Sequence, residues 1–106
     1  MTSTSIAQIQ AIVTDAFDVP LKDITGTSRI RHISWARHAG MYLAREETGT
    51  SYPLIGRKFG GFDHTSVHYA CNTAIFEHIA RCSDFASKFT KARNRIEQLC
   101  AANNVR

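Results

Sequence analysis

Four consecutive side chains, one residue after a glycine pair, combine a carboxylate, an imidazole and two hydroxyls: Asp63, His64, Thr65 and Ser66. A carboxylate can accept a hydrogen bond from a cytosine amino group, and an imidazole or a hydroxyl can reach a thymine methyl or oxygen. Two basic residues that suit phosphate contacts stand just before the glycines: Arg57 and Lys58. These residue types predict that the segment reads DNA by hydrogen bonds.

A metal or catalytic site is the first alternative for this segment. His64, His68 and Cys71 lie at i, i+4 and i+7, and His78 and Cys82 repeat the four-residue spacing. Structural zinc usually takes four ligands, often with closely spaced cysteine pairs, and the sequence has no such pair. No serine, cysteine or carboxylate constellation indicates catalysis. We therefore expect no metal, no cofactor and no enzymatic activity.

Two predicted helices position the polar residues. The first covers Tyr52–Phe59 and opens with Pro53, whose fixed φ suits a first helical turn. Gly60 and Gly61 end it, because glycine permits the positive φ of a tight reversal. Asp63 can then cap a second helix. Its predicted core stripe is Val67, Ala70, Cys71, Ala74, Ile75, His78 and Ile79. The spacing predicts a helix-turn-helix over about residues 52–81.

The N-terminal part of the chain also has helical patterns. Ser5 and Gln8 can form a capping box, and a stripe at helical spacing follows: Ile6, Ile9, Val13, Ala16 and Phe17. We expect one short helical turn over Leu21–Ile24. Residues 26–33 read as a basic loop, and we expect a longer helix from a Ser34 cap to about Glu47.

Side chains of that longer helix divide into two predicted groups. Trp35 and Tyr42 are expected in the core rather than as a ligand platform, whereas Arg37, His38 and Arg45 are expected away from it.

A last helix is predicted after Ser83 or Asp84 as its cap. Its apolar stripe is Phe85, Phe89, Ala92, Ile96 and Leu99. Its basic residues are expected to form a solvated face: Lys88, Lys91, Arg93 and Arg95. These patterns predict a small all-α bundle of about five to six helices, forming a single domain over residues 1–106.

Charge is distributed unevenly along the 106 residues, whose net charge is +4 and whose pI is about 9.3. Residues 1–23 sum to −2, whereas residues 24–69 and residues 70–106 each sum to +3. The positive charge thus begins where the predicted DNA-reading part begins, as expected for a polyanionic partner.

Three cysteines, an odd number, favour reduced thiols over a disulfide framework: Cys71, Cys82 and Cys100. No apolar run reaches the roughly 18 residues of a membrane span, and residues 1–5 lack the pattern of a signal peptide. We expect a cytoplasmic, nucleoid-associated protein with no membrane partner.

The helix-turn-helix segment resembles the signature of domain IV, the C-terminal DNA-binding domain of the bacterial replication initiator DnaA. That signature reads G-R-x-F-G-G-R-D-H-[ST]-[ST]-V-x-x-A. The matching residues are Gly56, Arg57, Phe59, Gly60, Gly61, Asp63, His64, Thr65, Ser66, Val67 and Ala70, and Cys71 follows directly. A match of this length is far beyond chance. A family run R-x-x-A-M-x-L-A-R-E is matched upstream by Arg37, Met41, Leu43, Ala44, Arg45 and Glu46.

The resemblance implies a Trp-repressor-like helix-turn-helix fold and sequence-specific binding of double-stranded DNA at DnaA-box-like sites, with the family consensus TTATCCACA. It implies that Arg29 enters the minor groove and that Asp63, His64 and Thr65 meet base edges in the major groove. Two further residues, Tyr52 and Pro53, would touch apolar base edges. The implied backbone contacts are Arg31, Arg57, Lys58 and Ser66.

No G-x-x-x-x-G-K-[ST] loop occurs in the sequence, so we expect no nucleotide binding. The expectation is a domain IV on its own that occupies boxes. Whether it regulates replication initiation or transcription stays open.

Two departures from the family pattern support a second hypothesis. Phe62 stands where the family usually has arginine, and Tyr69 stands where it usually has histidine. Phe62 could be an exposed contact for a partner chain or could fold back on Phe59, and Phe76 points outward by periodicity. The alternative is a protein-interaction module that keeps the fold with weakened DNA recognition.

Overall fold

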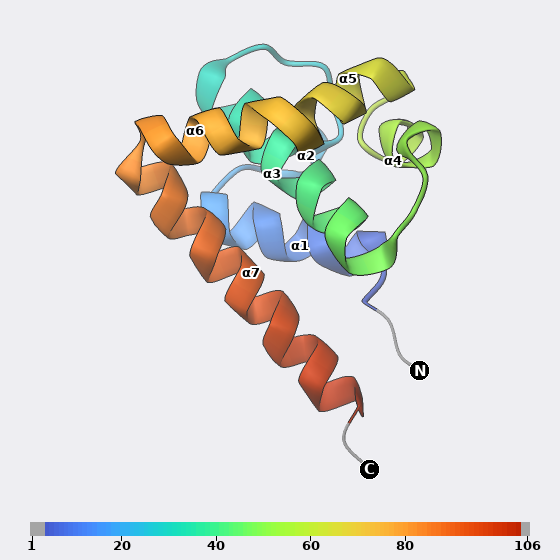
Figure 1. The fold of residues 1–106 in the computed structure, drawn as a ribbon, viewed down its shortest axis with the longest axis vertical. Helices are drawn as coiled ribbons and strands as arrows, with labels where there is room; N and C mark the ends of the chain where they lie inside the picture. The colour runs from blue at the N-terminus through green and yellow to red at the C-terminus, as the bar shows by residue number, and fades with distance from the viewer. Residues whose placement is uncertain (1–3, 105–106) are drawn as a thin grey trace.

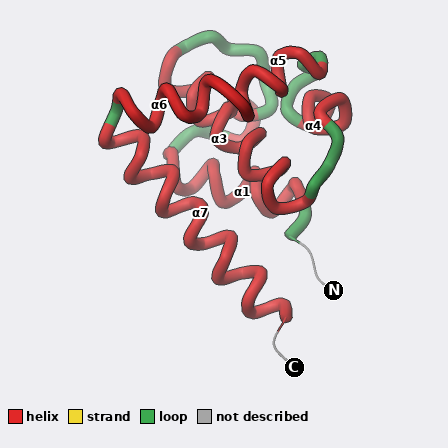
Figure 2. Tube along the Cα trace, in the orientation of Figure 1, coloured by secondary structure: helices red, strands yellow, loops and turns green. Residues whose placement is uncertain are grey.

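Helices form all the regular structure in residues 4–104, the part of the chain that the computed structural model describes (Figures 1 and 2). With the continuous rod α5–η1–α6 counted once, these residues form six helices, in agreement with the predicted all-α bundle. The elements are α1 (Ile6–Phe17), α2 (Leu21–Ile24), α3 (Arg31–Thr48), α4 (Tyr52–Lys58), α5 (His64–Tyr69), η1 (Ala70–Ala74), α6 (Ile75–Arg81) and α7 (Ser83–Asn104).

Helix α3 lies at the centre of the bundle. It contacts α1, α2, α4, η1 and α6, and Figure 1 shows the α5–η1–α6 rod crossing it. Helix α7 packs against α1 and α6 and then extends away from the other helices (Figure 1). The loop between α2 and α3, green in Figure 2, arches over the end of the bundle that also carries α5.

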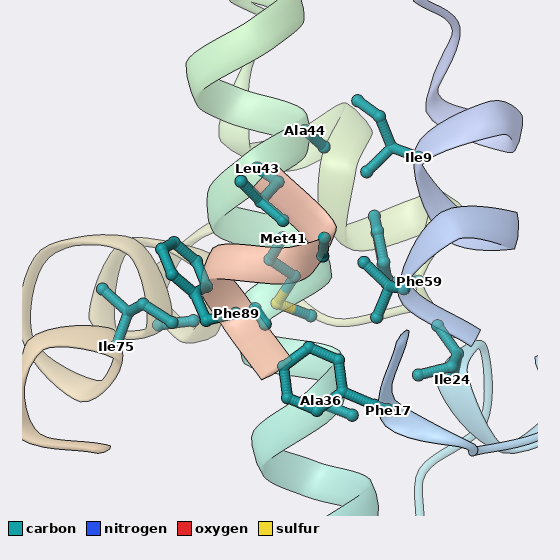
Figure 3. Packing of buried hydrophobic residues seen from close by; sticks show 14 of the residues in the cluster. Ile9, Phe17, Ile24, Ala36, Met41, Leu43, Ala44, Phe59, Ile75 and Phe89 are labelled. Atoms are coloured by element: carbon teal, nitrogen blue, oxygen red, sulfur yellow. The ribbon is translucent and has the colours of Figure 1, made fainter. Parts of the chain in front are cut away.

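Apolar side chains from distant parts of the chain meet in one core. Figure 3 shows Ile9 of α1, Leu43 of α3, Ile75 of α6 and Phe89 of α7 converging with Phe59, which follows α4. Because Phe59 is fully buried, the helix-turn-helix is anchored directly in this core. Within residues 4–104, none of the helices combines the length and apolar character that crossing a bilayer requires.

Several predicted helix starts are confirmed. Ser5 and Gln8 form the capping box, and α2 has the expected bounds. At α4, the Ser51 side chain accepts from the Leu54 amide at 3.4 Å, and Pro53 lies in the first turn. The local sequence rules therefore hold where a polar cap is available.

The predicted start of α3 is wrong, because the helix begins at Arg31 rather than after a Ser34 cap. Ile30 occupies the cap position, and its carbonyl accepts from the amides of Ile33 at 3.0 Å and Ser34 at 2.8 Å. An isoleucine side chain cannot accept a hydrogen bond, so this start has no side-chain cap and no sequence signal.

The predicted cap of α7 is also wrong. Cys82 precedes the helix, and its sulfur accepts from the Phe85 amide at 3.4 Å. Sulfur is a weak acceptor and does not appear among the usual cap residues. The expected apolar stripe is confirmed, with Leu99 half-buried and the other four buried: Phe85, Phe89, Ala92 and Ile96.

The basic face of α7 is solvated and forms exposed ion pairs. Lys88 pairs with Asp84, Arg93 with Glu46 and Arg95 with Asp15. Exposed pairs of this kind contribute little to stability.

Candidate nucleic-acid interface

The turn between α4 and α5 folds back tightly onto α4. Gly60 and Gly61 have φ of +114° and +88°, as predicted. The amides of Gly61 and Phe62 both donate to the Gly56 carbonyl, at 2.9 and 3.0 Å. A methyl group on Gly56 would lie 1.9 Å from the Phe62 carbonyl oxygen. The turn can therefore close only because position 56 has no side chain.

The first turn of α5 presents the polar residues singled out in the sequence. Asp63 caps the helix as predicted, accepting from the Ser66 amide at 2.9 Å. Hydrogen bonds from Ser66 hold the pKa of the Asp63 carboxyl below its usual value, so this group stays ionised. Asp63, His64, Thr65 and Ser66 are all exposed. This turn therefore offers acceptors and donors to solvent.

The loop that carries Arg29 is held by a residue whose role the sequence did not indicate. Arg37 was expected away from the core, and this is wrong, because the residue is only 3% exposed. Its guanidinium donates to the carbonyls of Asp23 at 2.8 Å, Ile24 at 3.1 Å and Ser28 at 3.0 Å. Burial lowers the pKa of the Arg37 guanidinium, and Asp23 partly offsets this. Arg37 thus ties the loop to α3.

The Arg29 loop and the first turn of α5 share one open groove of about 660 Å³. Arg29 and Ser28 line one side, and Asp63, Thr65 and Ser66 line the other. The groove also contains Thr27, Ser34, Arg37, His38, Met41, Phe62 and Tyr69. Two segments separated by more than 30 residues are therefore brought to the same face, with an exposed cation on one and hydrogen-bonding groups on the other.

Residues 6–74 match the sequence model of the family described as bacterial dnaA protein helix-turn-helix. This match covers both segments that line the groove. The chain belongs to the DnaA helix-turn-helix family.

Relatives of the DnaA family are similar to this chain over a limited part of their length. A chromosomal replication initiator protein DnaA from Nostoc punctiforme is 55% identical over 64 residues, which are 60% of this chain and 14% of the relative. The DnaA of Microcystis aeruginosa is 49% identical over 70 residues, 66% of this chain and 16% of the relative. The DnaA of Lactobacillus delbrueckii subsp. bulgaricus is 38% identical over 93 residues, 88% of this chain and 20% of the relative.

The chain thus spans about a fifth or less of the length of these DnaA relatives. The DnaA helix-turn-helix is a DNA-binding domain rather than a catalytic one, and membership of this family supports binding of double-stranded DNA.

Four other residues that the DnaA resemblance singles out do not line the groove. Tyr52 is half-buried, with the Arg45 guanidinium 4.5 Å from its ring centre and its hydroxyl accepting from Asn72 at 3.1 Å. Pro53 is exposed beside it, and Arg57 and Lys58 are exposed in the last turn of α4.

Arg31 is separated from the groove. Its guanidinium lies 4.4 Å from the Trp35 ring centre, and His78 stacks with the same indole at 3.8 Å. The residue lines a second concavity, together with His32 and Arg81. Trp35 is half-buried between these side chains and packs against the core, as expected, and it also lines this concavity.

Phe62 is not the exposed contact considered from the sequence. It is half-buried against the core, and the Arg37 guanidinium lies 5.2 Å from its ring centre. Phe62 therefore covers the arginine that holds the Arg29 loop. Phe76 is 54% exposed, as its outward position in the periodicity predicted, and Tyr69 is 50% exposed.

The residues considered for a metal site do not converge. His64 and His68 are exposed, whereas Cys71 is buried. Burial raises the pKa of the Cys71 thiol to about 11, so the thiol stays protonated and is a poor metal ligand. Across residues 4–104, no group of three histidine, cysteine or acidic side chains is arranged to hold a metal ion.

Two histidines form a part-buried pair, of which His38 also lines the groove. His38 Nδ1 and His78 Nε2 are 3.0 Å apart, so one ring must donate and the other accept, and the accepting ring must be neutral. Burial, and to a smaller extent the charges of His78 and Arg37, lower the pKa of His38 to about 4. Burial also lowers the pKa of His78.

Stability should therefore fall as the pH is lowered from about 6.5 towards 4. In this range the unfolded chain binds protons that the folded His38 excludes, so protonation favours unfolding. The loss should reach up to about 3 kcal/mol and level off below the folded pKa. Urea denaturation at a series of pH values measures it.

Two variants test whether the histidine pair, rather than other titrating groups, causes this pH dependence of stability. His38→Gln should remove most of this pH dependence, whereas the exposed His32→Gln should leave it unchanged. An identical pH dependence in wild type and His38→Gln would contradict the explanation.

Proposed function

We propose that the chain binds double-stranded DNA sequence-specifically at DnaA-box-like sites and so regulates replication initiation or transcription. The observation that carries the proposal is the groove lined jointly by Arg29 and the first turn of α5. A cation at one side and base-reading groups at the other suit a site that contacts neighbouring grooves of one duplex. Such a protein would act in the cytoplasm, on the nucleoid.

Each candidate residue has a proposed role. Asp63, His64 and Thr65 would read base edges in the major groove, because they are exposed at the start of α5. Arg29 would enter the minor groove, whose negative potential attracts arginine. Tyr52 and Pro53 would touch apolar base edges.

Phosphate contacts would hold the duplex against the protein without specifying its sequence. The proposed residues are Arg31, Arg57, Lys58 and Ser66. All four are exposed. Residues 1–106 would form one DNA-binding domain, with residues 52–81 as its helix-turn-helix.

Thr65→Ala and His64→Ala should each weaken binding to a TTATCCACA duplex by about 1–3 kcal/mol and to a scrambled duplex much less. Base-edge contacts would be lost while phosphate contacts remain. Fluorescence anisotropy on both duplexes measures the difference, and thermal melting shows whether the fold is intact.

Thr90→Ala is the matched control, because Thr90 is also exposed but lies on α7. It should change neither affinity. Equal losses on both duplexes for Thr65→Ala would show that the residue holds the backbone rather than reading the sequence.

A protein-interaction module is the second candidate, and the exposed Phe76 favours it. Its ring is 54% exposed and contacts only the edge of Tyr42 among the described aromatic rings, at 5.8 Å between ring centres. Under this alternative, wild-type protein would not distinguish the box from the scrambled duplex.

A further inference from the structure

The most exposed large apolar side chain among the described residues lies between two arginines. Ile30 is 59% exposed, more than Leu21, Tyr69 or Phe76. Arg29 precedes it and Arg31 follows it, and both are exposed. Exposing this much apolar surface is unfavourable, and the flanking cations indicate that a polyanion covers it.

Ile30 stands on a ridge. Arg29 lines the groove shared with α5, whereas Arg31 and His32 line the concavity on the other side. Ile30 lines neither, so it forms the crest between two hollows that each carry a cation. A single exposed side chain between two hollows is small enough to enter a minor groove, which is only about 6 Å wide.

The crest is fixed by hydrogen bonds on both sides of Ile30. Its amide donates to Ser28 Oγ at 3.2 Å, and its carbonyl accepts from Ser34 at 2.8 Å. The Ser28 carbonyl in turn accepts from Arg37. The backbone polar groups therefore face the protein, and the side chain projects into solvent.

We propose that Ile30 is an apolar wedge that enters the minor groove of bound DNA and partly unstacks a base step there. The inference rests on the proposed DNA-binding function and assigns to this residue a role beyond it. Apolar side chains inserted from the minor groove separate neighbouring bases, most easily at flexible pyrimidine–purine steps. Arg29 and Arg31 would hold the two strands on either side of the wedge.

The test uses duplexes that contain the box and carry 2-aminopurine, whose fluorescence rises on unstacking, at single adenines of the A·T-rich end. Wild-type protein should raise the fluorescence at one or two adjacent positions. Ile30→Ser should abolish this rise and weaken box binding about 5- to 20-fold. It should leave the salt dependence of binding unchanged, because no charge is removed.

Two controls keep the test specific. Ile30→Leu should retain the fluorescence signal, and Leu21→Ser, at a residue that is 51% exposed on α2, should change nothing. Ile30→Ser should fold normally, because serine is a favourable residue at the helix cap that Ile30 occupies.

An unchanged affinity of Ile30→Ser, or a weaker affinity with an unchanged fluorescence signal, would overturn the wedge. A wild-type protein that binds box and scrambled duplex equally would overturn the proposed function as well. That result needs no variant, so the two failures are distinguishable.

Discussion

Arg37→Met should lower the free energy of unfolding by about 3–5 kcal/mol. The guanidinium donates to three backbone carbonyls and is 3% exposed. Methionine fills a similar volume but cannot donate, so those carbonyls lose their partner where water has limited access. Urea denaturation followed by circular dichroism measures the loss.

The same variant should also relax DNA selectivity at the A·T-rich end of the site, because the Arg29 loop loses its attachment to α3 through Ser28. Parallel binding-site selections on wild type and variant would show this. Arg93→Met is the matched control, since Arg93 forms only exposed ion pairs and should change stability by less than about 1 kcal/mol. Similar losses for both variants would refute the role of Arg37.

Gly56→Ala should destabilise the protein by about 3 kcal/mol and abolish selective DNA binding. A methyl group at this position would meet the Phe62 carbonyl oxygen at 1.9 Å and Val67 Cγ2 at 3.3 Å. The turn would have to move away, which breaks the two hydrogen bonds to the Gly56 carbonyl and reorients α5. Thermal melting and anisotropy on box and scrambled duplexes measure both effects.

Gly49→Ala is the control for the general effect of adding a methyl group. Gly49 has a φ of +66° and nothing within 4 Å of the added carbon. It should therefore cost only about 1 kcal/mol of backbone strain and leave DNA binding intact. If Gly56→Ala melted at the same temperature as Gly49→Ala, the close approach of the turn would not be a constraint.

Structural features that depend on residues close together in the sequence could be predicted. The glycine turn, the Asp63 cap and the apolar stripes follow from rules that act over a few positions, and the structure confirms them. A glycine inside a predicted helix is unfavourable relative to alanine, so Gly56 is a position where the sequence itself suggests a packing constraint.

Features that depend on distant residues could not be predicted. An arginine on a helix is usually solvated, and the three carbonyls that accept from Arg37 lie 9 to 14 residues away, in α2 and in the loop that follows it. His38 and His78 are 40 residues apart, so no local pattern indicates their pairing. The DNA-contact roles stay predictions, although the structure brings Arg29 to the same groove as Asp63 and Thr65.

The attachment of the Arg29 loop has a consequence for the kinetics of DNA recognition. The protein's own hydrogen bonds, from Arg37 to the Ser28 carbonyl and from the Ile30 amide to Ser28 Oγ, fix the loop. Ordering a residue costs about 1–2 kcal/mol of conformational entropy, and here that cost falls on folding rather than on association. Binding can then approach rigid docking. In that case association rates differ little between DNA sites, and the protein discriminates between the sites by the dissociation rate of each complex.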